Sequence, residues 1–265
     1  MSHASEVRTS ALDRVVDGLG LPEDASEQLW AVVDVFDSSP ALRRTLSDPG
    51  SEPSDRQGLV RQVFSSKVPD PVVEVLVEAV GLRWASSADL VAAVERQGVR
   101  AELKRADAAG RLDDTEDELF RFARLVEANG ELRGALADKA VPVANRQQLV
   151  VDLLQDRGGE STVRLARRAV VARERTFGRT IDGYINLAAA QRNRTLATVR
   201  VARQLDDEQL SRLTAALTRQ AGRPVAVQVV VDPDLVGGVR VELGDQVIEG
   251  TVAGRLDQAR RSLTD

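Results

Sequence analysis

The segment between residues 225 and 250 constrains the fold of this chain more than any other. Its first seven residues, Val225 to Val231, are apolar except for one glutamine and are mostly β-branched, which favours a buried strand over a helix. Asp232, Pro233 and Asp234 then predict a turn, because proline lacks the N–H that a strand ladder requires. This end of the chain must therefore contain a sheet.

A hairpin is predicted to follow this first strand. The pair Gly237-Gly238 allows a positive φ or a close backbone approach that a Cβ atom would prevent. Val239, Val241 and Leu243 then alternate with polar residues, as expected of a half-buried strand. The remaining predicted elements are a turn at Gly244-Asp245, a return strand over residues 246–249, and a helix over residues 251–263 that follows Gly250.

The rest of the chain is predicted to be helical and contains an internal repeat. A shift of 90 positions aligns residues 42–60 with residues 132–150, and eight of the nineteen pairs are identical. Such self-similarity indicates a duplicated unit. The identical pairs are Leu42/Leu132, Arg43/Arg133, Leu46/Leu136, Asp48/Asp138, Arg56/Arg146, Gln57/Gln147, Leu59/Leu149 and Val60/Val150.

The predicted helices follow the same scheme in both copies, with Ser, Asp or Pro at their starts and Gly at several ends. In the first copy, the first helix spans residues 5–18, the second spans residues 26–37 after a cap at Asp24 to Ser26, and a short helix follows Pro40. The next helix is capped by Ser54 or Asp55 and reaches Phe64. Two more follow: one has Asp70 as N-cap and reaches Trp84, and the other begins at Ser86-Ser87 and ends near residue 109. In the second copy they span residues 115–126, 131–138, 143–155, 161–175 and 179–192, with stops at Gly110 and Gly158-Gly159.

We therefore expect a mainly α protein with a small C-terminal α/β domain. Two tandem helical bundles, residues 1–105 and 106–194, precede the domain of residues 195–265, which holds a short mixed sheet with helices. Only two Trp, one Tyr and five Phe are present, so the cores must be built from Leu, Val and Ala, which favours helix-on-helix packing. Residues 1–10 lack a signal-peptide apolar region, and the longest nearly apolar run is too short to cross a membrane.

The sequence offers no recognisable catalytic or metal-binding arrangement. It has no cysteine and a single histidine, His3, which excludes thiol catalysis, a Ser-His-Asp triad and a metal site built on Cys or His. No phosphate-binding loop or dinucleotide motif is present. Asp232 with Asp234, and Gly237 with Gly238, are better explained as turns than as a metal pair or a phosphate cradle. We expect no enzyme, and no cofactor, metal or small-molecule substrate.

Each copy contains one apolar stripe with the i, i+3, i+4, i+7 spacing of an amphipathic helix. The stripe is Leu29, Val32, Val33 and Phe36 in the first copy, and Leu119, Phe122, Ala123 and Val126 in the second. Packing in a bundle core is the favoured interpretation. The alternative is a groove for a partner helix, in which the candidate contacts are Leu29, Val32, Phe36, Leu119, Phe122 and Val126.

Two charged segments also require an interpretation. The acidic run of residues 113–118 lies at a predicted helix start, where carboxylates interact favourably with the helix dipole. Residues Arg164 to Arg203 include ten arginines and only two acids. This basic segment is either a solvated helix surface or a docking surface for an acidic partner. Nucleic acid is the least favoured partner, because the net charge is −5 and few aromatic residues could stack on bases.

The C-terminal segment resembles a known family signature. Asp-Pro-Asp-Leu-Val-Gly-Gly-Val at residues 232–239, then Gly-Asp-Gln-Val-Ile-Glu-Gly-Thr-Val at residues 244–252 and Arg255-Leu256, are similar to the C-terminal signature of the F-type ATP synthase delta subunit, the family of the oligomycin-sensitivity-conferring protein. The resemblance implies a structural role for Asp232, Pro233, Leu235, Gly237, Gly238, Gly244, Asp245 and Gly250. That family carries one helical bundle; the duplicated bundle here resembles long actinobacterial members.

The resemblance implies a function as a peripheral-stalk (stator) subunit of the proton-transporting ATP synthase. It implies a non-catalytic protein that binds the N-terminal helices of the ATP synthase alpha subunits and the b-type stalk subunits, with the helical part on the head and the α/β domain on the stalk. It also implies a peripheral location at the cytoplasmic face of the cell membrane, held there by the complex. The alternatives are a helical-repeat scaffold that binds amphipathic helices of another complex, and a nucleic-acid-binding protein that uses the basic segment.

Overall fold

The computed structural model describes residues 3–155, 157–171, 176–192, 195–221, 225–232, 235, 238–243 and 246–251. The chain forms two compact units. One comprises Met1–Leu12 and Leu21–Arg192, and we call it the helical unit; the other comprises Asp13–Gly20 and Asn193–Asp265, and we call it the α/β unit. The mainly α fold with a small α/β part is as predicted, and the division near residue 193 lies close to the expected start of the last domain.

The first copy of the repeat folds into a run of helices that agrees closely with the predicted one. Pro40 occupies the first turn of its helix, and the side chain of Ser86 caps another by accepting a hydrogen bond from the backbone N–H of Asp89 at 3.2 Å. The helices are α1 (His3–Asp17), α2 (Ala25–Ser38), α3 (Pro40–Leu46), α4 (Pro53–Phe64), α5 (Asp70–Gly81) and α6 (Ser87–Ala108).

Two details of the first copy differ from the prediction. Helix α4 starts at Pro53 with Glu52 as its N-cap, so neither Ser54 nor Asp55 caps it. The reason is that proline fixes its own φ in the helical range and can begin the helix earlier. Helix α5 likewise has Pro69 as N-cap and includes Asp70, and it ends at Gly81 rather than at Trp84, because Leu82 adopts an extended backbone.

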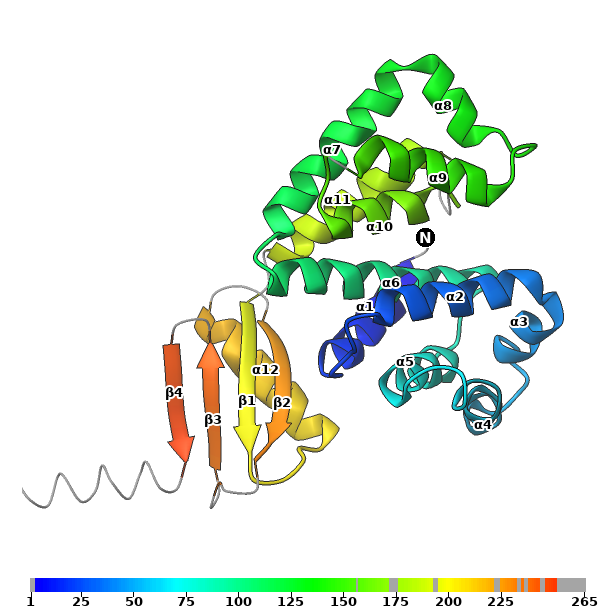
Figure 1. Ribbon diagram of the computed structural model, residues 1–265. Helices are drawn as coiled ribbons and strands as arrows, with labels where there is room; N and C mark the ends of the chain where they lie inside the picture. Colours follow the sequence, from blue (N-terminus) through cyan, green and yellow to red (C-terminus); the bar gives the residue numbers. More distant parts are fainter. Residues whose placement is uncertain are drawn as a thin grey trace, which may run out of the picture. The chain divides into compact units, whose positions relative to one another are not determined.

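The second copy repeats these helices with the same register. Its helices are α7 (Leu112–Ala128), α8 (Gly130–Ala137), α9 (Val143–Leu154), α10 (Glu160–Ala169) and α11 (Phe177–Arg192). A shift of 90 residues carries α4 onto α9 at both ends, and α1 onto residues 93–107 of α6. Helix α6 is therefore both the last helix of the first copy and the first helix of the second, and Figure 1 shows it running alongside both groups of helices.

The duplication is also visible in side-chain hydrogen bonds. Gln57 donates to the carbonyl oxygen of Val77 at 3.4 Å, and Gln147 donates to that of Arg167 at the same distance. Residues 77 and 167 differ by the same 90 positions as the two glutamines. The predicted repeat is thus confirmed as a structural one. We call α2 to α6 the first bundle and α6 to α11 the second bundle.

The α/β unit contains β1 (Thr195–Val201), α12 (Asp207–Ala221), β2 (Val225–Val231), β3 (Gly238–Leu243) and β4 (Gln246–Thr251). The strand order is β2-β1-β3-β4, with β1 parallel to β2 and antiparallel to β3. Parallel neighbours need a crossover connection, and α12 provides it. The predicted strands are confirmed, whereas β1 was not assigned from the sequence. Thr251 belongs to β4 and not to a helix; the rest of the helix predicted there lies outside the described residues.

No helix among the described residues is both long and apolar enough to cross a lipid bilayer.

Candidate functional site

The apolar stripes form the cores of the two bundles. All six candidate partner contacts are buried: Leu29, Val32, Phe36, Leu119, Phe122 and Val126 are each at most 5% exposed. Phe36 packs edge-on against Phe64 with ring centroids 6.0 Å apart, and Phe122 packs in the same way against Phe177 at 5.9 Å. The structure thus places these residues where the favoured core interpretation put them. A partner helix would have to open a bundle to reach them.

The described residues of the C-terminal signature shape the sheet. Gly238 has a φ of 87°, a conformation that residues with a Cβ rarely adopt, and Gly250 pairs with Val239 between β4 and β3. The backbone N–H of Asp232 donates to the carbonyl oxygen of Val201 at 2.8 Å, and that of Leu235 donates to the carbonyl oxygen of Asp232 at 3.2 Å. Pro233, Gly237, Gly244 and Asp245 lie outside the described residues.

We expect Gly238→Val to destabilise the α/β unit by about 1–2 kcal/mol, because a β-branched residue is strained in a left-handed conformation. Urea unfolding of the purified chain measures the effect. Gly250→Ala is the control, since Gly250 lies in β4 and pairs with Val239 of β3. Equal stability of Gly238→Val and the unchanged chain would mean that the turn does not require glycine.

The contact between the two bundles contains a deeply buried ion pair. Nε of Arg168 on α10 donates to Oε1 of Glu95 on α6 at 2.8 Å, and its Nη2 donates to Oε2 at 2.6 Å. Nη1 of Arg168 reaches Asp34 on α2 at 2.8 Å. The side chains of Arg168 and Glu95 are only 5% and 6% exposed. The two parallel hydrogen bonds make this a bidentate pair, the strongest form of such a contact.

The electrostatics of this pair follow from its surroundings. Burial alone lowers the pKa of the Arg168 guanidinium, but its hydrogen bonds with Glu95 and the charges of Glu95 and Asp34 outweigh burial and raise the pKa above its ordinary value. The arginine therefore keeps its charge inside the contact. The two bundles are thus tied by a guanidinium on α10, a buried carboxylate on α6 and a more exposed carboxylate on α2.

Trp30 completes the contact from the first bundle. It lies on α2 but packs with the core of the second bundle, which includes Val99 and Leu103 of α6. The guanidinium carbon of Arg168 lies 5.8 Å from the centre of its ring, within the range of a cation–π interaction. A Cβ atom on Gly98 would come within 2.7 Å of the indole Cδ1, so only glycine leaves room for the ring.

A second group of polar contacts lies along the same contact between the two bundles. We call this contact, formed by side chains of α2, α6 and α10, the seam. Glu102 of α6 is fully buried and accepts hydrogen bonds from Ser26 at 2.6 Å and from Arg105 at 2.7 Å. Arg105 also donates to Glu160 of α10 at 3.1 Å. Arg167, next to Arg168, donates to Glu27 of α2 at 2.6 Å. Charged side chains of α2 and α6 thus pair with charged side chains of α10 along the seam.

These contacts change the interpretation of the basic segment. Arg164, Arg167 and Arg168 interact with acids of the same chain, so this part of the segment is neither an open solvated face nor a free docking surface. The sequence could not reveal the pairing, because the paired residues of α2 and α10 are 134 and 140 positions apart. A partial signal was available: Glu95 and Glu102 are seven residues apart, on the same face of a helix interior as Gly98.

The acidic run at residues 113–118 does serve a helix start. Asp113 and Asp114 lie in the first turn of α7, as predicted, and Arg111 pairs with Asp114 at 3.0 Å. Glu118 accepts hydrogen bonds from the backbone N–H of Gly159 at 2.7 Å and from the hydroxyl of Thr162 at 2.5 Å. Across the part of the chain that the structure describes, no group of three or more potential ligands could hold a metal ion.

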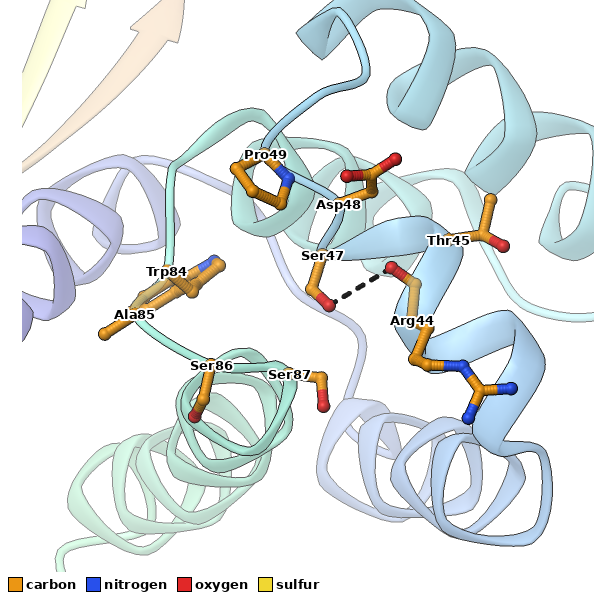
Figure 2. A pocket seen from close by; sticks show the side chains of 9 residues that line it. All are labelled: Arg44, Thr45, Ser47, Asp48, Pro49, Trp84, Ala85, Ser86 and Ser87. Atoms are coloured by element: carbon orange, nitrogen blue, oxygen red, sulfur yellow. Dashed lines mark hydrogen bonds between the residues drawn. The ribbon is translucent and has the colours of Figure 1, made fainter.

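A surface cleft of about 490 Å³ lies between the end of α3 and the start of α6. Its polar groups already serve the local structure. Asp48 accepts from the backbone N–H of Gly50 at 2.9 Å and from Ser51 at 3.0 Å, which together hold its pKa below the usual value, and Ser47 donates to the carbonyl oxygen of Arg44 (Figure 2). The lining residues are Arg44, Thr45, Ser47, Asp48, Pro49, Trp84, Ala85, Ser86 and Ser87. We assign no ligand to this cleft.

Comparison with known proteins identifies the family. A family model described as ATP synthase delta (OSCP) subunit matches residues 94–263, more than half of the chain. The chain belongs to this family. The match begins within α6, at the start of the second copy, and runs through the α/β unit. The second bundle and the α/β unit are thus the part that the family model describes, and the first bundle precedes it.

Relatives named ATP synthase subunit delta match almost the whole chain, including the first bundle. The protein from Cutibacterium acnes is 45% identical over 252 residues, which cover 95% of this chain and 96% of the relative. The protein from Kineococcus radiotolerans is 43% identical and covers 89% and 86%, and that from Streptomyces avermitilis is 38% identical and covers 98% and 96%. This delta-family chain is a peripheral-stalk subunit of ATP synthase, as the C-terminal signature implied.

Proposed function

We propose that this subunit connects the catalytic head of ATP synthase to the b-type stalk subunits and resists the torque of the rotor. The second bundle would bind the N-terminal helices of the alpha subunits, and the α/β unit would bind the b-type subunits. The match of the family model to these two parts supports this division of labour. The protein would act at the cytoplasmic face of the membrane through the complex, without catalysing a reaction itself.

The observation that carries this proposal is the match of the family model to the second bundle and the α/β unit. The contact between the two bundles supports a mechanical role, because it braces the second bundle. A connector under load must not bend at a hinge, and here α6 runs continuously through both bundles. The pair Arg168–Glu95 and the indole of Trp30 fix the second bundle against the first. The first bundle therefore braces the second through packed helices rather than through a flexible linker.

The strength required of the connector favours several contacts in series. An interface with a Kd of about 10⁻⁸ M corresponds to roughly 11 kcal/mol. A subunit that grips the head and the stalk at once gains further from effective concentration, because release of one contact leaves the other in place. A two-unit chain with separate binding surfaces suits this arrangement better than a single-domain protein.

The test is a reconstitution. Catalytic head and b-type subunits are purified without this subunit, and each is titrated with the tagged chain in analytical size-exclusion chromatography. We expect the chain to bind both and to bring them into one complex. The chain without the α/β unit should still bind the head. Failure of the full chain to bind either component, although the rest of the synthase is intact, would refute the connector function and favour an unrelated helical scaffold.

A further inference from the structure

The internal repeat relates one edge of α2 to one edge of α7. A shift of 90 residues pairs Glu27 with Asp117, Trp30 with Phe120, and Asp34 with Arg124. The two edges therefore share an acid and an aromatic residue at the same places on their helices. They differ in the third position, where an acid in the first copy is replaced by an arginine in the second.

The edge of α2 already shows what such a surface does. Helix α10 packs on it, with Arg167 paired to Glu27 at 2.6 Å and Arg168 paired to Asp34 at 2.8 Å. The aromatic residue between these acids, Trp30, is only 4% exposed. This edge thus binds a helix through a central aromatic ring and through charges of the opposite sign on the incoming helix.

The equivalent edge of α7 is open. Phe120 is 48% exposed, and it is the only aromatic residue among the exposed large apolar side chains of the described part of the chain. The guanidinium of Arg124 lies 5.2 Å from the centre of its ring and pairs with Glu127 at 2.7 Å. Aromatic residues and arginines of this kind are enriched among the residues that dominate the energetics of protein interfaces.

We propose that the edge formed by Asp117, Phe120 and Arg124 binds an amphipathic helix of the catalytic head. The charge of Arg124 is opposite to that of Asp34, so the partner helix presents a carboxylate to Arg124 and an apolar side chain to Phe120. In the first copy, α10 instead presents Arg168 and packs on Trp30. This proposal rests on the function proposed above, because that function places the second bundle on the head. It adds a second surface, distinct from the buried stripes.

Two variants and two matched controls test the proposal. Phe120→Ser and Arg124→Glu each alter the edge. Leu125→Ser alters a side chain on the same helix that is equally exposed at 47%, and its first-copy counterpart, Val35, stays 42% exposed outside the seam. Lys139→Glu reverses an exposed charge outside the edge, and its counterpart in the first copy is Pro49. All four positions are exposed, and circular dichroism confirms that each variant folds.

The measurement is the affinity of each variant for catalytic head purified without this subunit, from fluorescence anisotropy of the labelled chain. We expect Phe120→Ser and Arg124→Glu each to raise Kd by about tenfold or more, and the two controls to change it by less than about threefold. Cross-linking from position 120 should reach a subunit of the head.

Three results would be informative in different ways. If the unchanged chain does not bind the head, the proposed function itself fails. If the unchanged chain binds and both edge variants bind equally well, the function stands and the α7 edge is not part of the contact. If the edge variants lose affinity only for isolated b-type subunits, the edge binds the stalk, and the assignment to a helix of the head is wrong.

Discussion

Replacement of Arg168 by methionine should lower the free energy of unfolding of the helical unit by about 3–5 kcal/mol. The substitution keeps much of the side-chain volume but leaves the carboxylate of Glu95, 6% exposed, without the guanidinium that binds it through two hydrogen bonds. Asp34 loses a weaker contact, since its side chain is 60% exposed. Urea unfolding followed by far-UV circular dichroism gives the free energy.

The adjacent arginine provides the control. Arg167 also bridges the bundles, but its side chain and that of Glu27 are 38% and 40% exposed, so Arg167→Met should cost only about 0–1 kcal/mol. The double variant Arg168→Met with Glu95→Leu should recover much of the loss, because apolar residues can replace a buried ion pair at little net cost. Equal destabilisation by Arg167→Met and Arg168→Met would show that burial does not distinguish the two contacts.

Gly98→Ala should destabilise the helical unit by about 1–3 kcal/mol, although alanine is the better helix former. The new methyl group would come within 2.7 Å of the indole Cδ1 of Trp30. Because this ring is packed in the core of the second bundle, either the ring or the helix must shift. Because the chain has two tryptophans, fluorescence in a Trp84→Phe background reports on Trp30 alone, and we expect its emission to shift to the red.

The sign of this effect separates packing from helix propensity. Gly58 lies inside α4, and no neighbouring side chain comes within 4 Å of the place that a Cβ atom would take, so Gly58→Ala should stabilise the chain by about 0.5–1 kcal/mol. Trp30→Leu should relieve the cost of Gly98→Ala, so the pair should be less destabilising than the sum of the single changes. A stabilising effect of Gly98→Ala would contradict the tight contact between α6 and the indole.

Much of the fold follows from local signals in the sequence. The positions of Pro40 and Ser86 indicated two helix starts, and the β-branched run Val225–Val231 coincides with β2 at both ends. Strand β1 was missed because its alternation of Val and Ala with Thr and Arg is short and follows a long helical region. Its pairing depends on β2 and β3, which are contacts at a distance that local patterns do not reveal.

The contacts across the seam could not be predicted from the sequence for a related reason. Arginines at positions 167 and 168 resemble surface residues, since a helix with such charges normally exposes them. Their pairing depends on the acids that α2 and α6 bring to the same place. The sequence did show that the two copies are related, but a repeat alone does not say whether its copies are separate or packed together; here the shared helix α6 decides it.

The shared helix also limits how this chain could have been shortened or lengthened in evolution. A module joined by a linker can be lost in one step, and the remaining domain keeps a complete surface. Here α6, which is about 33 Å long over its 22 residues, belongs to both copies. Its residues from Ala93 onward end the first copy and also form the opening helix of the second. Deletion of α2 to α5 would uncover Gly98, Glu95 and the arginines of α10 together. We therefore expect a single-bundle member of the family to carry different residues on this face.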